Sequence, residues 1–391
     1  MERFYFGNQI ELLKNGDGYF PALLREITTA RYSIHIETYI FELDDSGVPV
    51  AEALIAAAAR GVQVHLLLDG FGARDFPTSW QARMLKAGIR LLFFRPEISR
   101  WALQRRRLRR LHRKIAVIDA RVAFVGGINI IDDRNTPHQV PPRYDYAVRV
   151  QGPLLPAIQD AVRHMWWQVC WAQFKQPWLT VLSYPAESQV MGDMEAALVV
   201  RDNLRHRRAI EQCYLAAIQR AHHEILIANA YFLPGIAFRR ALFAAAKRGV
   251  RVVVLLQGRV EYLLLHYATR TLYRSFLDNG IEIWEYRRSF MHAKVAVIDG
   301  VWATVGSSNI DPFSLLLARE ANVVVRDSRF AAELRHDLFH SLAYASARVE
   351  LDEVRRAPWW RRILPWLSYA LVRSAMGIVG YGRQEYTASD E

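Results

Sequence analysis

The sequence contains little cysteine. Cys170 and Cys213 are the only two among 391 residues. Such a pair makes neither the disulfide framework of a small secreted domain nor the CxxC spacing of a metal site. We therefore expect a chain that stays reduced in the cytoplasm. The 52% of hydrophobic residues is enough to build large cores.

The sequence also lacks a long uninterrupted apolar segment. Residues 1–20 contain no basic region followed by an apolar stretch, so we expect neither a signal peptide nor a membrane anchor there. In the segment 359–382 the longest uncharged run, Ile363 to Val372, has ten residues. A helix needs about 20 residues to cross a bilayer. Paired tryptophans beside paired arginines favour a segment that lies in the lipid headgroup region. The alternatives are a tilted span that includes Arg373 and a helix packed on the protein or on a partner subunit.

Acidic residues are outnumbered, with 39 Asp and Glu against 51 Lys and Arg, and the formal net charge is +12. This charge indicates a polyanionic partner, either nucleic acid or an anionic membrane surface. Seven arginines gather in residues 95–110, together with Trp101, Leu103 and Leu108. One interpretation is a solvated basic loop. We favour a contact with anionic lipid or nucleic acid, because the arginines lie beside the motif described next.

What the sequence does contain is a duplicated polar motif. Residues 111–130 (LHRKIAVIDARVAFVGGINI) and 291–310 (MHAKVAVIDGVWATVGSSNI) start 180 residues apart and are identical at 11 of 20 positions without a gap. Each copy has His-x-Lys, then an Asp, a Gly and an Asn. A histidine and a lysine two residues apart on a strand point to the same face. Each copy therefore places an imidazole beside an ammonium group at one end of an apolar strand.

The duplication decides how this motif is interpreted. A single His-x-Lys on a strand is usually an ordinary edge position, whereas two copies with the same downstream residues indicate a site. A metal or other cofactor is not expected. A protonated lysine cannot be a ligand, and no His or Cys nearby has the spacing of a zinc site. Two histidines and two lysines around one point suit chemistry on a phosphate.

The internal repeat extends beyond the motif. Residues 30–41 resemble 221–232, and 60–70 resemble 248–258. The order predicted for each half is strand, Ala-rich helix, strand, helix, strand and His-Lys strand, with the Ala-rich helices at about 48–60 and 235–248. This order is typical of a layered α/β lobe with parallel strands. We expect an α/β fold of two similar α/β/α lobes. They would form a pseudo-dimer with mixed, largely parallel sheets and bring both histidines into one cleft.

Three regions are expected along the chain: an N-terminal lobe at 1–180, a C-terminal lobe at 181–350 and a basic, Trp-rich tail at 351–391. Residues 153–175 are predicted to form a helix with a broad aromatic face. Its Trp166, Trp167 and Trp171 are interpreted as packing between the lobes rather than as a ligand-binding box.

The paired motifs are suited to two-step transfer of a phosphoryl group. One neutral imidazole, of His112 or His292, attacks phosphorus and forms a phosphohistidine, while the other histidine gives a proton to the leaving alcohol. Lys114 and Lys294 neutralise the phosphate oxygens. Hydrogen bonds to the phosphate are expected from the amides and hydroxyls that follow each motif: Asn129, Asn309, Ser307 and Ser308.

Each histidine also needs a carboxylate that orients its ring, as in the triads of hydrolases. Asp145 lies 33 residues beyond His112, and Glu320 lies 28 residues beyond His292. Their comparable positions make both residues candidates for this role.

The aspartates of the motif, Asp119 and Asp299, complete the candidate catalytic set. They lie seven residues beyond the histidines, on the opposite strand face or in the following turn. This position favours a structural role for both.

With these residues in view, the sequence resembles the phospholipase D superfamily, which carries paired HxKxxxxD motifs with a trailing Gly and Asn. The resemblance covers residues 8–345. Within the superfamily, the stretches LLKNGDGYFPAL, IETYIFELDDSG, ANAYFLPG and WATVGSSNIDPFSL are similar to bacterial cardiolipin synthases. The similarity is greatest to the shorter B type, which lacks the two N-terminal membrane helices of the longer enzymes.

The resemblance implies metal-free transfer of a phosphatidyl group from one phospholipid to the headgroup hydroxyl of phosphatidylglycerol, which gives cardiolipin and releases glycerol. It also implies that His112 is the nucleophile and His292 the acid and base, an order that the residues alone do not rank. The expected partners are phosphatidylglycerol, with phosphatidylethanolamine as an alternative donor, and an anionic membrane surface contacted by 95–110 and 359–382. We expect a peripheral protein on the cytoplasmic face of the bacterial cell membrane.

Other functions of the same superfamily stay open. A phospholipase D-type hydrolase, or a nuclease or other phosphodiesterase, would use the same phosphohistidine with water in the second step. The basic charge suits a nuclease. However, nucleic-acid binding does not require a segment such as WWRRILPWLSY (359–369), so nucleic acid is not the expected partner. A binding protein without activity is disfavoured because both motifs are intact.

Overall fold

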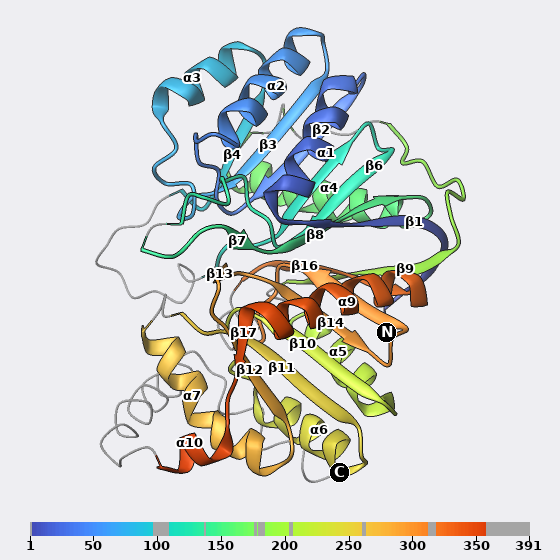
Figure 1. Cartoon of the computed structure of the whole chain (residues 1–391). Helices are drawn as coiled ribbons and strands as arrows, with labels where there is room; N and C mark the ends of the chain where they lie inside the picture. Colours follow the sequence, from blue (N-terminus) through green and yellow to red (C-terminus); the bar gives the residue numbers. More distant parts are fainter. Residues whose placement is uncertain are drawn as a thin grey trace.

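The computed structural model describes residues 2–96, 109–136, 138–175, 178, 184–202, 206–259, 263–311 and 318–356. The chain forms two lobes, one stacked on the other (Figure 1). Most of the basic segment 95–110 and the whole segment 359–382 lie outside the described residues, so their membrane contacts stay predictions. In the described part of the chain, no helix is both long and apolar enough to cross a membrane.

The first lobe begins with a long strand and ends with a long helix. Its elements are β1 (Tyr5–Lys14), α1 (Asn15–Thr29), β2 (Ser33–Thr38), α2 (Gly47–Ala59), β3 (Gln63–Asp69), α3 (Thr78–Lys86), β4 (Arg90–Phe94), β5 (Lys114–Ile118), β6 (Val122–Gly126), β7 (Arg143–Tyr144), β8 (Tyr146–Gln151) and α4 (Leu155–Ala172). The predicted Ala-rich helix at about 48–60 is α2.

The second lobe repeats this order, with two exceptions. Its elements are β9 (Met194–Arg201), α5 (Ala209–Arg220), β10 (Glu224–Asn229), α6 (Ile236–Lys247), β11 (Arg251–Gln257), α7 (Leu263–Asp278), β12 (Glu282–Tyr286), β13 (Phe290–Met291), β14 (Lys294–Ile298), β15 (Trp302–Gly306), β16 (Glu320–Arg326), α9 (Ser328–Ala345), β17 (Ser346–Arg348) and α10 (Leu351–Arg356). The exceptions are that the short strand β13 precedes the His-Lys strand and that β17 and α10 follow the last long helix. The second predicted Ala-rich helix is α6. The expectation of two similar α/β lobes is confirmed.

One sheet runs through both lobes in the order β17-β12-β11-β10-β14-β15-β16-β9-β1-β8-β6-β5-β2-β3-β4. The antiparallel pair of β1 and β9 joins the two halves at its centre. The expectation of mixed sheets is confirmed, but the expectation that they are largely parallel is wrong. Within the sheet of the described residues, parallel pairing is confined to β2-β3-β4 and β10-β11-β12. The His-Lys strands β5 and β14 instead enter hairpins with β6 and β15, and a hairpin connection makes a pair antiparallel.

Three apolar cores support this sheet. Each lobe has an outer core of its own, covered by α1, α2 and α3 in the first lobe and by α5, α6 and α7 in the second. A central core contains residues of both lobes and of the helices α4 and α9. Figure 1 shows α9 along the boundary between the lobes. The shared core fixes the two halves, and hence the two motifs, relative to each other.

The three tryptophans of α4 do not all pack between the lobes. Trp166 is buried in the central core, where its ring contacts the rings of His35 and His65. Trp167 and Trp171 are 49% and 65% exposed. The expectation of lobe-to-lobe packing is wrong for these two, because α4 buries only the face that carries Trp166.

Candidate active site

Each motif histidine lies just before a buried strand, at the boundary between the lobes. His112 precedes β5 and His292 precedes β14, and both strands are buried throughout. The backbone N–H of His112 donates to the carbonyl of Arg319 at 2.9 Å. The backbone N–H of His292 donates to the carbonyl of Tyr144 at 2.8 Å. Each histidine is thus anchored through its backbone to the other lobe.

The side chains cross the boundary in the same way. Nδ1 of His112 lies 3.0 Å from Oε1 of Glu320 in the second lobe. Nδ1 of His292 lies 2.6 Å from Oδ2 of Asp145 in the first lobe. Both candidate carboxylates therefore contact a motif histidine, but each contacts the histidine of the other lobe. The cross-lobe pairing of β7 with β13, and of Leu111 with Arg319, brings these groups together.

The carboxylates decide which ring nitrogen can react. A carboxylate at Nδ1 holds the hydrogen on that nitrogen and leaves the lone pair on Nε2. Burial lowers the pKa of His292 to about 3, with the Lys294 cation contributing and Asp145 opposing. Burial also lowers the pKa of His112, against the opposing charge of Glu320. Both rings are therefore neutral near pH 7, and each has a nucleophilic Nε2.

The two motif lysines are buried next to the histidines. Nζ of Lys114 donates to the carbonyl of His112 at 2.7 Å. Nζ of Lys294 donates to the carbonyl of His292 and lies 3.6 Å from Oδ2 of Asp145. Burial lowers the pKa of Lys114 to about 7, with repulsion by Lys294 contributing and Glu320 opposing. Two buried cations at one place favour the binding of an anion such as a phosphodiester.

The serines after the second motif were expected to bind phosphate, and Ser307 has a different role. Its hydroxyl donates to Oε2 of Glu320 and accepts the backbone N–H of Ala321 at 3.1 Å. Ser307 therefore supports the carboxylate that orients His112. The neighbouring Ser308 is also buried, and its hydroxyl donates weakly to the carbonyl of Asn309 at 3.3 Å.

The equivalent position in the first lobe is Gly127, where a side chain would not fit. A Cβ at this residue would lie 2.3 Å from Oδ1 of Asp145. The short Asp145 is thus packed against bare backbone, whereas the longer Glu320 is held by a serine hydroxyl. The two half-sites are similar but not identical.

The asparagines of the motif, Asn129 and Asn309, are buried. Oδ1 of Asn129 accepts the backbone N–H of Ile40 at 3.1 Å, so this residue fixes the loop after β2. Oδ1 of Asn309 has no hydrogen-bond partner among the described residues. A contact of Asn129 with phosphate would have to come from its Nδ2 amide.

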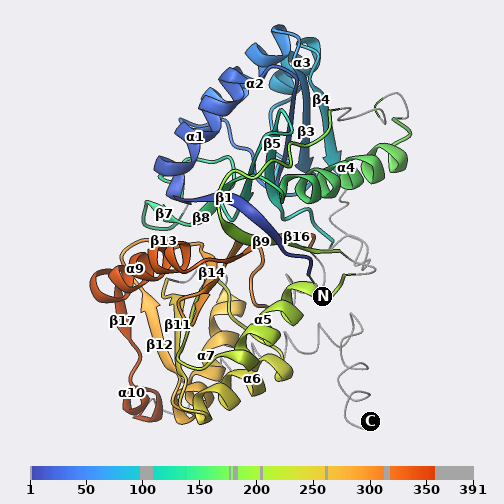
Figure 2. The same ribbon diagram turned by 90° about the vertical axis from the view of Figure 1, so that its right-hand side faces the viewer.

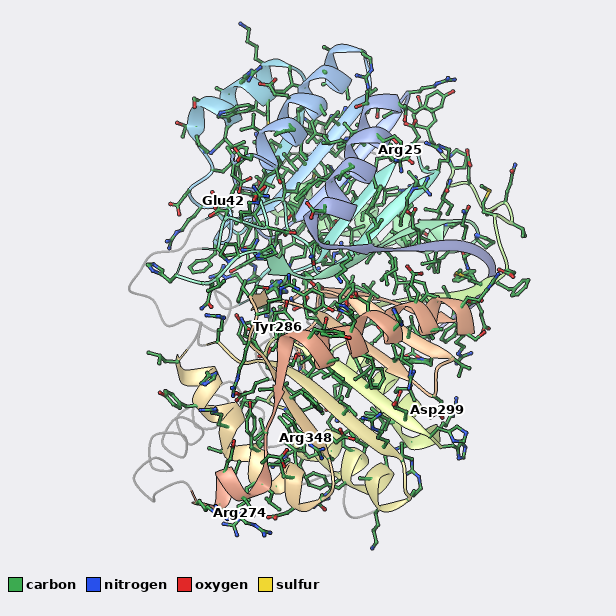
Figure 3. The ribbon with its side chains drawn as sticks, in the orientation of Figure 1. Arg25, Glu42, Arg274, Tyr286, Asp299 and Arg348 are labelled. Carbon is green, nitrogen blue, oxygen red and sulfur yellow. The ribbon has the colours of Figure 1, made fainter. Side chains whose placement is uncertain are left out.

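The aspartates of the motif are at the wrong end of their strands for catalysis. The carboxylate of Asp119 accepts the backbone N–H groups of residues 31–33. That of Asp299 accepts those of residues 222–224. Figure 3 shows Asp299 far from Tyr286, whose ring stacks on Tyr144 beside the site. The inclusion of both aspartates in the catalytic set is therefore corrected, and the structural role is favoured.

Further residues position the motif histidines. Oδ2 of the buried Asp69 accepts the backbone N–H of Leu111 at 2.7 Å, and Oε1 of Gln257 accepts that of Met291 at 3.3 Å. Asp69 and Gln257 were not among the residues predicted from the sequence. The repeat was the available signal, since it aligns RGVQVHLLLDG with RGVRVVVLLQG and thereby Asp69 with Gln257. In the described part of the chain, no group of three or more His, Cys, Asp or Glu side chains could hold a metal ion.

The ring of Tyr39 borders the first half-site. It contacts the imidazole of His112 edge to face at 5.0 Å between ring centres. Nζ of Lys114 lies 5.5 Å from the same ring centre. Tyr39 therefore packs against both reactive side chains of the first motif.

Comparison with known proteins gives a consistent result. The family model described as "Cardiolipin synthase, PLD-like domain" matches residues 23–164 and 214–342, more than half of the chain. Cardiolipin synthase B of Escherichia coli K12 is 37% identical over 375 residues, which are 96% of this chain and 90% of that protein. Cardiolipin synthase A of Yersinia pestis is 30% identical over 93% of this chain and 75% of its own length.

A solved structure shares the fold. Phosphatidylserine synthase of Haemophilus influenzae Rd KW20 superposes with a TM-score of 0.71 over 95% of this chain and 94% of that one. Its sequence identity is 12%, so this likeness concerns the fold alone.

Proposed function

The chain belongs to the cardiolipin synthases with phospholipase D-like domains, and we propose that it transfers a phosphatidyl group from one phospholipid to the headgroup hydroxyl of phosphatidylglycerol. Membership of this family makes it an enzyme, a phosphatidyltransferase. The observation that carries the proposal is the crossed pair of histidines, each oriented by a carboxylate of the other lobe. This arrangement supplies one nucleophile and one proton donor on opposite sides of a phosphate.

In the first step, Nε2 of one histidine attacks the phosphorus of the donor lipid. An N–P bond forms and the bond from phosphorus to the headgroup oxygen breaks. The other histidine gives its proton to that oxygen, and the headgroup alcohol leaves. The anionic phosphodiester itself raises the pKa of this second histidine, which favours the protonated ring when substrate is bound.

In the second step, the now neutral second histidine takes the proton of the phosphatidylglycerol hydroxyl. The hydroxyl oxygen attacks phosphorus, the N–P bond breaks and cardiolipin leaves. Following the family pattern, we assign His112 as the nucleophile and His292 as the acid and base. Lys114 and Lys294 neutralise the non-bridging phosphate oxygens through both steps.

The substrate places the enzyme at a membrane surface. The net charge of +12 supports a peripheral association with anionic lipid, for which the cytoplasmic face of the bacterial membrane is proposed. Phosphatidylglycerol serves as acceptor, and either phosphatidylglycerol or phosphatidylethanolamine serves as donor.

The test is to incubate the purified protein, in EDTA, with mixed micelles of phosphatidylglycerol and phosphatidylethanolamine and to identify the products by mass spectrometry. We expect cardiolipin, and the alcohol released, glycerol or ethanolamine, identifies the donor. Phosphatidic acid as the sole product would mean that water accepts the phosphatidyl group and the protein is a hydrolase. No lipid turnover would contradict the proposal and direct the search to nucleic acid.

A further inference from the structure

Helix α4 exposes an aromatic face, and we propose that this face contacts the phospholipid bilayer and holds the active site at its surface. The inference rests on the proposed function, because it concerns how the active site reaches a substrate that lies in a bilayer. It adds a membrane contact to those predicted from the sequence, and this one lies within the described residues.

The face consists of Trp167, Trp171 and Phe174, which are 49%, 65% and 86% exposed. Trp167 and Trp171 are four residues apart, which puts them on one side of α4, and Phe174 follows two residues after the end of the helix. The opposite side of α4 is buried in the central core through Trp166 and Val169. The exposed aromatic rings are therefore not needed for folding.

Contacts at the C-terminal end of α4 fix this face relative to the active site. Nε2 of Gln173 donates to the carbonyl of Phe93 at 2.6 Å, at the end of β4. Oε1 of Gln168, the neighbour of Trp167, accepts from Nη1 of Arg319 at 2.8 Å. The carbonyl of Arg319 holds the backbone of His112. A series of contacts thus connects the aromatic face with a motif histidine. Figure 2 shows α4 beside β4 on the outside of the first lobe.

The exposed cation beside the face is Lys175, which follows Phe174 and suits an anionic lipid surface. Arg163, one turn before Trp167, is half exposed, and its guanidinium lies 3.9 Å from the carboxylate of Asp160, which offsets its charge. Tryptophan concentrates at the level of lipid headgroups, and a cation near an anionic membrane strengthens binding to it. The contact from Gln173 to Phe93 also places the helix end next to the start of the basic segment 95–110. An anionic bilayer offers the aromatic rings an apolar environment and the cations an opposite charge.

The experiment compares the full-length protein with the triple variant Trp167→Ser, Trp171→Ser, Phe174→Ser. Binding to vesicles of phosphatidylglycerol and phosphatidylethanolamine is measured by sedimentation. We expect the partition coefficient to fall roughly tenfold or more, because interfacial binding scales with the apolar area that enters the bilayer. Tyr344→Ser is the matched control, since this tyrosine on α9 is 75% exposed and lies in the other lobe. It should leave binding unchanged.

A second measurement distinguishes the effect of the triple variant on membrane binding from its effect on catalysis. With short-chain phosphatidylglycerol dissolved as monomers, the triple variant should turn over substrate as fast as the wild type, while its activity on vesicles falls. Unchanged vesicle binding of the triple variant would overturn the inference. The inference would also be overturned if the triple variant lost a concentration-dependent self-association of the wild type while its vesicle binding stayed unchanged. The aromatic face would then bind a second copy of the chain. If the wild type makes no cardiolipin but the variant still loses vesicle binding, the membrane surface stands and the proposed function fails.

Discussion

At the scale of single residues, burial sets the protonation of the site before any substrate binds. The pKa of both motif histidines is lowered chiefly by burial, which leaves the rings neutral near pH 7. The same cause brings the pKa of Lys114 to about 7. The charge of this lysine therefore changes near neutral pH.

A pH profile tests this statement. The Lys114 cation is present below pH 7 and is lost as the pH rises through the lowered pKa. The value of kcat/KM, which reports the free enzyme, should therefore fall above about pH 7. In Lys114→Arg the guanidinium stays charged, so any remaining activity should lack this alkaline limb. A wild-type kcat/KM that is constant from about pH 6 to 9 would contradict the assignment.

The crossed carboxylates make a second prediction. Glu320→Gln and Asp145→Asn keep the shape of each side chain but remove the charge that orients the histidine. We expect each to lower kcat by about 10²–10⁴-fold, as loss of the orienting carboxylate does in triad enzymes.

A double-mutant cycle identifies the partners. Adding Glu320→Gln to His112→Ala should cost little more than His112→Ala alone, because the carboxylate acts through that ring. Measured transfer rates that show the same coupling between Glu320 and His292 would contradict the crossed arrangement.

At the scale of elements, each motif aspartate joins its strand to the start of a neighbouring one. Asp119 follows β5 and binds the backbone just before and at the start of β2, and Asp299 does the same between β14 and β10. In Asp299 these N–H donors outweigh the effect of burial and lower the pKa of the carboxyl. The histidine and lysine of each motif thus lie at one end of the strand. The carboxylate of its aspartate, a structural clamp on the neighbouring strand, lies at the other end.

The clamp predicts a loss of stability without a loss of chemistry. Asp119→Ala and Asp299→Ala should each reduce the free energy of unfolding by about 1–2 kcal/mol, the cost of leaving backbone N–H groups without their carboxylate. The value of kcat at a temperature well below the melting point should change less than about twofold. Thermal denaturation and a transfer assay on the same samples check both numbers. A loss of kcat in a fully folded Asp119→Ala sample would return this residue to the catalytic set.

At the scale of the whole molecule, the two halves of one chain together form one complete candidate site. Each half contributes a histidine and the carboxylate for the other half, so neither lobe is sufficient alone. A mixture of His112→Ala and His292→Ala should therefore remain inactive, because each chain lacks one of its own two histidines. Transfer restored by mixing the two variants would show that the site forms between chains.

The sequence predicted much of this arrangement, and its failures have physical causes. The repeat predicted two α/β lobes, the helices α2 and α6 and the meeting of the two His-Lys motifs at the boundary between the lobes, because hydrophobic periodicity and spacing are local properties. Strand direction was wrong because alternating strands and helices were taken to mean parallel pairing throughout, whereas β5 with β6 and β14 with β15 form local hairpins. The partner of each carboxylate was missed because it depends on tertiary contacts between the lobes. Position along the chain cannot show that Asp145 faces His292 rather than His112.

The central claim is that a histidine of the pair carries the phosphatidyl group during transfer. We would mix the wild type with phosphatidylglycerol in EDTA, quench it during turnover with cold denaturant at mildly basic pH, which spares both the N–P bond and the acyl esters, digest it and analyse the peptides by mass spectrometry. The account predicts a phosphatidyl adduct on the peptide that contains His112, and its absence from His112→Ala. Cardiolipin formed at the full rate with no adduct on either motif histidine would contradict the account.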